Sequence, residues 1–189
     1  LAGRINGSAT IENITNQAQL VIINPADNGN CYAGMIGFIA NNITATINIV
    51  DCVNTGKIDG QTNGTKLGGF IGSIIWYTSG KLTLNITNCD NAGQVTGKSY
   101  VGGVIGSVEG EATLGLIKCT FINCDNTANI TATTTYAGGI IGEVGTTTAV
   151  TLSNNTHYTG NVVAGSVTAT SEYGVASTYA GKIIGQMPT

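Results

Sequence analysis

Apolar and polar residues alternate along much of this chain, in short runs rich in β-branched side chains and closed by glycine. In residues 82–86 (Leu-Thr-Leu-Asn-Ile) every second side chain is apolar, which is the period of a strand with one buried face. No stretch of ten or more residues has the 3.6-residue period of an amphipathic helix. The pattern therefore predicts an all-β protein.

One apolar motif that ends in glycine returns along the chain, at residues 33–37, 68–72, 102–106, 138–142 and 181–185. Its final glycines are 35, 34, 36 and 43 residues apart. A nearly constant period in this range indicates a solenoid, in which each repeat forms one turn of a stack.

A second motif, Asn/Asp-Cys-x-Asn-x-Gly in its fullest form, keeps the same period between the glycine motifs. It lies within residues 49–58, 86–95 and 121–130, with altered copies at 11–20 and from 152 onward. Each repeat then consists of a Thr/Ile/Leu strand, a turn, a short strand and the glycine strand. Residues 101–108 are an example of the glycine strand. We predict a parallel β-helix (β-solenoid) of about five coils of about 35 residues, with three short strands per coil. Residues 1–189 are expected to form one domain, as a segment of a longer repeat protein or as a filament subunit.

Stacking would align equivalent residues of successive coils about 4.8 Å apart. The expected apolar ladder contains Ile36, Ile71, Ile105, Ile141 and Ile184, and the expected cysteine row contains Cys52, Cys89 and Cys124, continued by Ile14 and Asn155. A first amide row contains Asn13, Asp51, Asn88, Asn123 and Asn154. A second amide row contains Asn16, Asn54, Asn91 and Asn126 and is ended by His157. Stacked amides can bond from coil to coil, which satisfies them at a buried corner.

The chain has 5 cysteines, an odd number that excludes a complete set of disulfides within one chain. We predict free thiols packed as small apolar side chains, with Cys119 in a local insertion at residues 115–120. A bridge between neighbouring members of the cysteine row is the alternative. A zinc site is not expected, because the chain has 1 histidine and no Cys-x-x-Cys pair.

Charge is sparse, with 9% of residues charged and a net charge of −3. This gives no basic surface for nucleic acid, and no apolar run is long enough for membrane insertion. The acidic residues are spread thinly, so we predict no catalytic residues, cofactor or metal. A weak Ca²⁺ site at the stacked Asp90 and Asp125 is the alternative.

An aromatic row is also expected, in which Cys31 and Lys66 are followed by Tyr100, Tyr136 and Tyr179. This row is a candidate platform for stacking on sugars, and so is the pair of Trp76 and Tyr77.

The chain contains seven Asn-x-Ser/Thr sequons, beginning at Asn6, Asn13, Asn42, Asn63, Asn85, Asn129 and Asn154. Glycan acceptors must be exposed, so the candidate glycosylation sites are those expected in loops: Asn63, Asn42 and Asn6.

The glycine motif followed by a Gly-x-Val stretch resembles the GLUG repeat. Residues 68–72 and 102–106 match its first element and residues 93–97 match its second. The resemblance covers the chain from about Ile11 onward, although Lys182 replaces a motif glycine in the last copy. It implies a large secreted or cell-surface protein, such as a bacterial adhesin, with no catalytic residues in the repeat.

We therefore expect a non-enzymatic extracellular or cell-surface module that serves as stalk, adhesin or filament subunit. No capping helix is predicted, so the expected partners are a second copy stacked end to end or further repeats of the same chain, with glycans or host or cell-surface proteins as candidate ligands. The alternatives are a carbohydrate-active or carbohydrate-binding β-helix and an ice-binding face at threonine-dense patches such as residues 131–135.

Overall fold

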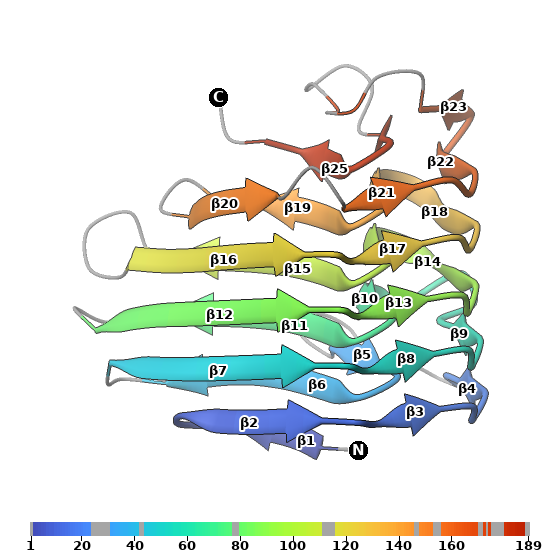
Figure 1. The fold of residues 1–189 in the computed structure, drawn as a ribbon. Helices are drawn as coiled ribbons and strands as arrows, with labels where there is room; N and C mark the ends of the chain where they lie inside the picture. Colours follow the sequence, from blue (N-terminus) through green and yellow to red (C-terminus); the bar gives the residue numbers. More distant parts are fainter. Residues whose placement is uncertain are drawn as a thin grey trace.

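The computed structural model describes residues 2–23, 31–41, 44–76, 80–110, 116–145, 148–152, 156–169, 172, 174 and 180–187, without the side chains of Asn41 and Trp76. Asn42, Asn154, Asn155, Tyr77 and Tyr179 lie outside these residues, so their predicted places are not tested. The described residues contain strands and turns and no helix. Strands of successive repeats pair in parallel throughout the stack, which confirms the predicted parallel β-solenoid (Figure 1).

Four sheets run along the stack, which we name A to D in the order in which the chain enters them. Sheet A contains β1 (Ala2–Ile5), β6 (Ile36–Asn41), β11 (Ile71–Trp76), β15 (Ile105–Gly110), β19 (Ile141–Val144) and β25 (Ile184–Gln186). Sheet B contains β2 (Ala9–Glu12), β7 (Ala45–Val50), β12 (Lys81–Thr87), β16 (Leu116–Ile122) and β20 (Thr148–Leu152). Sheet C contains β3 (Thr15–Asn16), β8 (Val53–Asn54), β13 (Asp90–Asn91), β17 (Asp125–Asn126) and β21 (His157–Tyr158).

Sheet D is the largest, because two strand positions of each turn merge in it. It contains β4 (Leu20–Val21), β5 (Tyr32–Ala33), β9 (Ile58–Asp59), β10 (Thr65–Gly68), β14 (Val95–Gly102), β18 (Ile130–Gly138), β22 (Val162–Ala164), β23 (Val167–Thr168) and β24 (Ala180–Gly181). Each turn therefore contributes strands to four sheets, whereas three strands per coil were predicted. The difference arises because residues of the cysteine turn form the short strand of sheet C. From β2 to β20 the chain makes four turns, slightly fewer than the five coils expected.

The glycine motif forms a corner and not one continuous strand. β14 ends at Gly102, β15 begins at Ile105, and the chain crosses from sheet D to sheet A between them. A Cβ atom on Gly102 would lie 1.8 Å from the carbonyl oxygen of Ile105, so no larger side chain fits this corner. The motif repeats because every turn makes the same crossing.

Two apolar cores fill the stack. The main core lies between sheets A and B and contains the apolar ladder, whose members pair in register from Ile36 through Ile71, Ile105 and Ile141 to Ile184. All five isoleucines are buried, as predicted. The second core lies inside sheet D, where Ile58, Val95 and Ile130 pack against Leu67 and Val101. The corner glycines and the second amide row lie between the two cores.

The two ends of the stack differ. Among the described residues, β1 to β5 each pair on one side only, with β6 to β10. At the other end the chain folds back over its last turn: β23 pairs antiparallel with β22, and the Glu172 carbonyl accepts hydrogen bonds from the amides of Ile183 (2.8 Å) and Ile184 (3.1 Å). The Ile183 carbonyl accepts from Ile140 and Ile141 in the same way one turn earlier, so Glu172 takes the place of a further rung. The expected open edge is therefore present at the N-terminal end. At the C-terminal end the fold-back covers the edge beside β22 and β25, whereas β20 and β21 each pair on one side only among the described residues.

Candidate functional site

The second amide row is a buried hydrogen-bonded ladder. Asn54 Nδ2 donates to Asn91 Oδ1 and Asn91 Nδ2 donates to Asn126 Oδ1, both at 2.7 Å. Asn16 joins at the N-terminal end through a 2.7 Å bond from its Nδ2 to Asn54 Oδ1. Asn54, Asn91 and Asn126 are fully buried, so these amides depend on one another for partners. The predicted ladder is confirmed as a structural element.

His157 does not end this ladder, contrary to the prediction. The register pairs Tyr158 with Asn126, and His157 with Asp125. The offset between paired residues grows from 31 at Phe121 and Leu152 to 32 at Asp125 and His157, so the extra residue of this repeat lies before His157. By the same offset of 32, Thr156 corresponds to Cys124.

The first amide row is exposed and not buried. Asn13, Asp51, Asn88 and Asn123 all have φ between 52° and 57°, in the left-handed region that asparagine and aspartate tolerate best among non-glycine residues. Asn88 Nδ2 donates to Asp51 Oδ1 at 2.9 Å, and Asn123 Nδ2 donates to Asn88 Oδ1 at 3.1 Å. The row recurs because the chain turns a sharp corner between sheets B and C.

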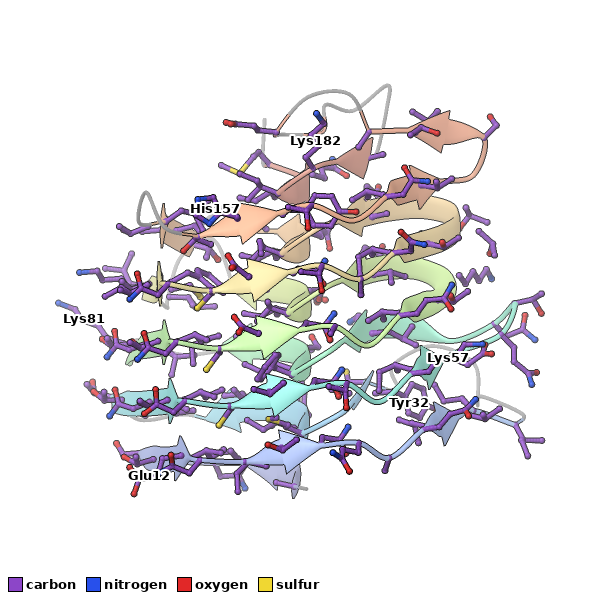
Figure 2. All side chains as sticks on the ribbon, turned by 45° about the vertical axis from the view of Figure 1, so that its right-hand side comes forward. Glu12, Tyr32, Lys57, Lys81, His157 and Lys182 are labelled. Carbon is purple, nitrogen blue, oxygen red and sulfur yellow. The ribbon has the colours of Figure 1, made fainter. Side chains whose placement is uncertain are left out.

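Beside this corner lies a shallow polar groove, which we call the Asp90 groove. It is lined by Asn88, Asp90, Asn123, Asp125 and His157. His157 lies on the outer surface of the stack, with Nδ1 3.1 Å from Asp125 Oδ1 (Figure 2). No described group of three or more His, Cys, Asp or Glu side chains is arranged to hold a metal ion. The groove can offer carboxylate, amide and imidazole groups to a polar ligand.

A second polar group, which we call the Lys66 cluster, lies at the corner between sheets D and A. Lys66 Nζ is 2.8 Å from Glu109 Oε1, and Ser107 Oγ donates to the same oxygen at 2.6 Å. Ser73 Oγ lies 3.1 Å from Ser107 Oγ, and both serines are fully buried. Burial, followed by the charge of Glu109, raises the pKa of Glu143 to about 7, while Lys66 opposes the shift.

The Lys66 cluster was not predicted from the sequence, because its members are far apart along the chain. Glu109 lies in β15, and Ser107 pairs with Glu143 in β19. A signal was available: Ser73, Ser107 and Glu143 each directly follow the final glycine of a glycine motif.

Tyr100 and Tyr136 form the predicted row, continuing Lys66 in register. Their rings stack with centroids 4.9 Å apart and planes at 19°. Each ring therefore covers one face of the other, and that face is not available for stacking on a sugar.

All five cysteines are thiols in the structure. Cys52, Cys89 and Cys124 are buried, and their Sγ atoms lie within hydrogen-bonding distance of backbone carbonyls, as Cys89 does of Thr87 at 3.1 Å. Cys119 is not in an insertion: it lies in β16 and pairs with Leu84 at the same 35-residue offset that joins Asp90 and Asp125.

We expect iodoacetamide to label the native protein at Cys31 alone, the one cysteine that is not fully buried. Burial raises the pKa values of Cys89 and Cys119 to about 12, so almost no thiolate is present at these positions near neutral pH. Peptide mass spectrometry after labelling, with and without denaturant, measures this. All five should be labelled once the protein unfolds; a Cys52–Cys89 bridge in the denatured sample would contradict the assignment.

The sequons differ in accessibility. Asn63 is exposed in the turn after β9, and Asn6 is exposed after β1, where its Oδ1 accepts a hydrogen bond from Arg4. Asn85, by contrast, donates its Nδ2 to Asn48 Oδ1 within sheet B. Asn63 and Asn6 stay candidate acceptors.

Comparison with known proteins finds no protein family, no curated protein and no solved structure that matches this chain. Within the described residues, no helix is long and apolar enough to cross a membrane.

Proposed function

We propose that this chain is a non-enzymatic structural or adhesive module of an extracellular or cell-surface protein, serving in a stalk, an adhesin or a filament. The observation that carries the proposal is the difference between the two ends of the stack. An uncovered sheet edge presents unpaired backbone N–H and C=O groups and therefore takes up further strands. At the C-terminal end the fold-back over β22 and β25 occupies part of the edge, so fewer backbone groups are open to pairing there.

The uses of the polar side chains support this proposal. The buried amides bond from rung to rung, and so do the exposed side chains of Asp51, Asn88 and Asn123, where Asp51 accepts through its carboxylate. These side chains hold the stack together and leave few groups for chemistry. The resemblance of the glycine motif to the GLUG repeat favours the same function and location.

We propose that the N-terminal edge, formed by β1 to β5, joins a further rung in parallel register or meets a second copy of the chain. Stacking through this edge gives pairs of chains or a continuous rod. Unlimited head-to-tail filaments would need the fold-back over β22 and β25 to open, because it occupies part of the C-terminal edge.

Negative-stain electron microscopy and analytical ultracentrifugation of the purified chain test the proposal. We expect concentration-dependent pairs joined at the N-terminal edge. A lysine on an edge strand blocks such pairing, so Thr10→Lys in β2 should give monomers. Thr168→Lys is the matched control, because Thr168 is also exposed but lies in β23, in the fold-back at the C-terminal end. Equal association of both variants, or a monomer at all concentrations, would contradict end-to-end pairing.

The second candidate function is carbohydrate binding at the Asp90 groove. Its carboxylates and amides are groups that bond sugar hydroxyls, and it is exposed on the side of the stack. A glycan array with the Asp90→Ala/Asp125→Ala variant as control separates the two functions: binding that this variant loses would favour the groove.

A further inference from the structure

One row of sheet A faces away from the main core and ends in two polar side chains at the C-terminal turn. The register runs from Ser73 to Ser107, then to Glu143 in β19 and Gln186 in β25. Glu143 and Gln186 are thus direct neighbours on adjacent rungs, on the same face of the sheet. β25 is the last strand of sheet A, so this side-chain pair lies where the sheet meets its cover.

The nearby cation is already paired with another acid. Lys66 Nζ lies 2.8 Å from Glu109 Oε1, and its side chain is only 18% exposed. No described cation forms an ion pair with Glu143. Two carboxyl groups therefore share the neighbourhood of one ammonium group, and the second is more stable when neutral.

Gln186 carries an acceptor that lacks a donor. Its Oε1 is buried and has no hydrogen-bond partner among the described residues. Leaving such an oxygen unpaired is costly, and the neighbouring carboxyl group can donate to it only when protonated.

We propose that Glu143 carries a proton in the folded protein and donates it to Oε1 of Gln186, so that the two side chains form a pH-sensitive clasp holding β25 on β19. The clasp is closed while the carboxyl group is neutral. Ionisation removes the donor, places a carboxylate against the buried oxygen and loosens the last strand of sheet A.

Burial of Glu143, followed by the charge of Glu109, sets the direction of its pKa shift. Glu109 in β15 and Lys66 in β10 act on Glu143 through their charges, and Tyr100 in β14 lies near enough for Glu143 to act on it. Tyr136 and Cys31 belong to the same cluster. With a pKa of about 7 in the fold against its usual 4.5, Glu143 keeps a proton that the unfolded chain has lost between these two values. Stability therefore falls as the pH rises through this window and is constant above it.

Hydrogen exchange of the β25 amides tests the clasp. After correction for the intrinsic pH dependence of exchange, their protection should fall about threefold to tenfold as Glu143 ionises, the value of one net hydrogen bond. Glu143→Gln keeps a donor without a titrating group, so its protection should not change with pH. Glu109→Gln is the matched control: it removes the neighbouring carboxylate, so the step should remain and move to lower pH. A step that persists in Glu143→Gln would overturn the proposal.

A second measurement separates the clasp from burial alone. Carbon-13 NMR of the Glu143 carboxyl group reports its pKa directly in the wild type and in Gln186→Leu. The clasp predicts a lower pKa in this variant, because the acceptor that stabilises the neutral acid is lost. Burial alone predicts an equal or higher pKa, because leucine is less polar than glutamine. An equal or higher pKa would therefore refute the clasp even if the β25 strand shows a pH-dependent change.

Discussion

Replacing Gly102 by alanine is expected to abolish the native fold or to lower the free energy of unfolding by about 4 kcal/mol or more, beyond ordinary overpacking. The new Cβ would lie 1.8 Å from the Ile105 carbonyl oxygen and 2.8 Å from the Gly142 amide nitrogen. Both are backbone atoms at the crossing from sheet D to sheet A. They cannot move aside as the end of a flexible side chain can, so two turns of the stack must shift. Urea titration followed by circular dichroism measures the loss.

Gly3→Ala is the matched control, because a Cβ at Gly3 in β1 meets no atom within 4 Å. Its effect on the free energy of unfolding should stay within about 0.5 kcal/mol. A Gly102→Ala protein as stable as Gly3→Ala would show that the corner does not have the geometry described.

Asn91→Ala is expected to lower the free energy of unfolding by about 3–5 kcal/mol, because it interrupts the buried amide ladder at its middle. The side chain accepts from Asn54, donates to Asn126 and donates to the Gly93 carbonyl at 3.0 Å. Its removal leaves buried groups on neighbouring turns without partners and opens a cavity between the two cores. The same urea titration gives the difference from the wild type.

Asn88→Gly provides the comparison for this effect. Asn88 also bonds to asparagine or aspartate on both neighbouring turns, but it is exposed and its φ is 53°. Glycine keeps the left-handed conformation and water replaces the lost bonds, so we expect a cost of no more than about 1 kcal/mol. Equal losses from the two variants would mean that burial is not what makes the ladder important.

The sequence predicted the stacking rows well because each row follows from one repeated constraint. Ile71 and Ile105 recur where the chain meets the main core, and Asn54 and Asn91 recur where two amides must bond to each other. Parallel pairing in register converts a period in the sequence directly into contacts in space.

Other features escaped prediction because they depend on where extra residues lie. The repeat that contains His157 gains its residue before the histidine, and the alignment of motifs could not fix that position. The fourth sheet was missed because β13 has only two residues, too few to show alternation. The fold-back beside β25 was missed because Glu172 bonds through its backbone carbonyl, which any residue supplies.

Of the candidate sites, the sequence identified the stacked Asp90 and Asp125 but not the Lys66 cluster. Asp90 and Asp125 belong to the second motif, which recurs clearly in the sequence. Lys66, Glu109 and Glu143 belong to different turns and meet only because the chain folds back sharply at the glycine corner.

The first and last strands of sheet A, β1 and β25, lie at opposite ends of the stack (Figure 1). A force that pulls β1 and β25 apart along the axis of the stack would act parallel to the hydrogen bonds between rungs. These bonds would then break one rung after another. Such a protein lengthens by peeling one turn at a time, and each turn of about 35 residues releases about 120 Å of extended chain. The solenoid would then act as an extensible tether that yields in steps, with the length of each step set by the repeat period.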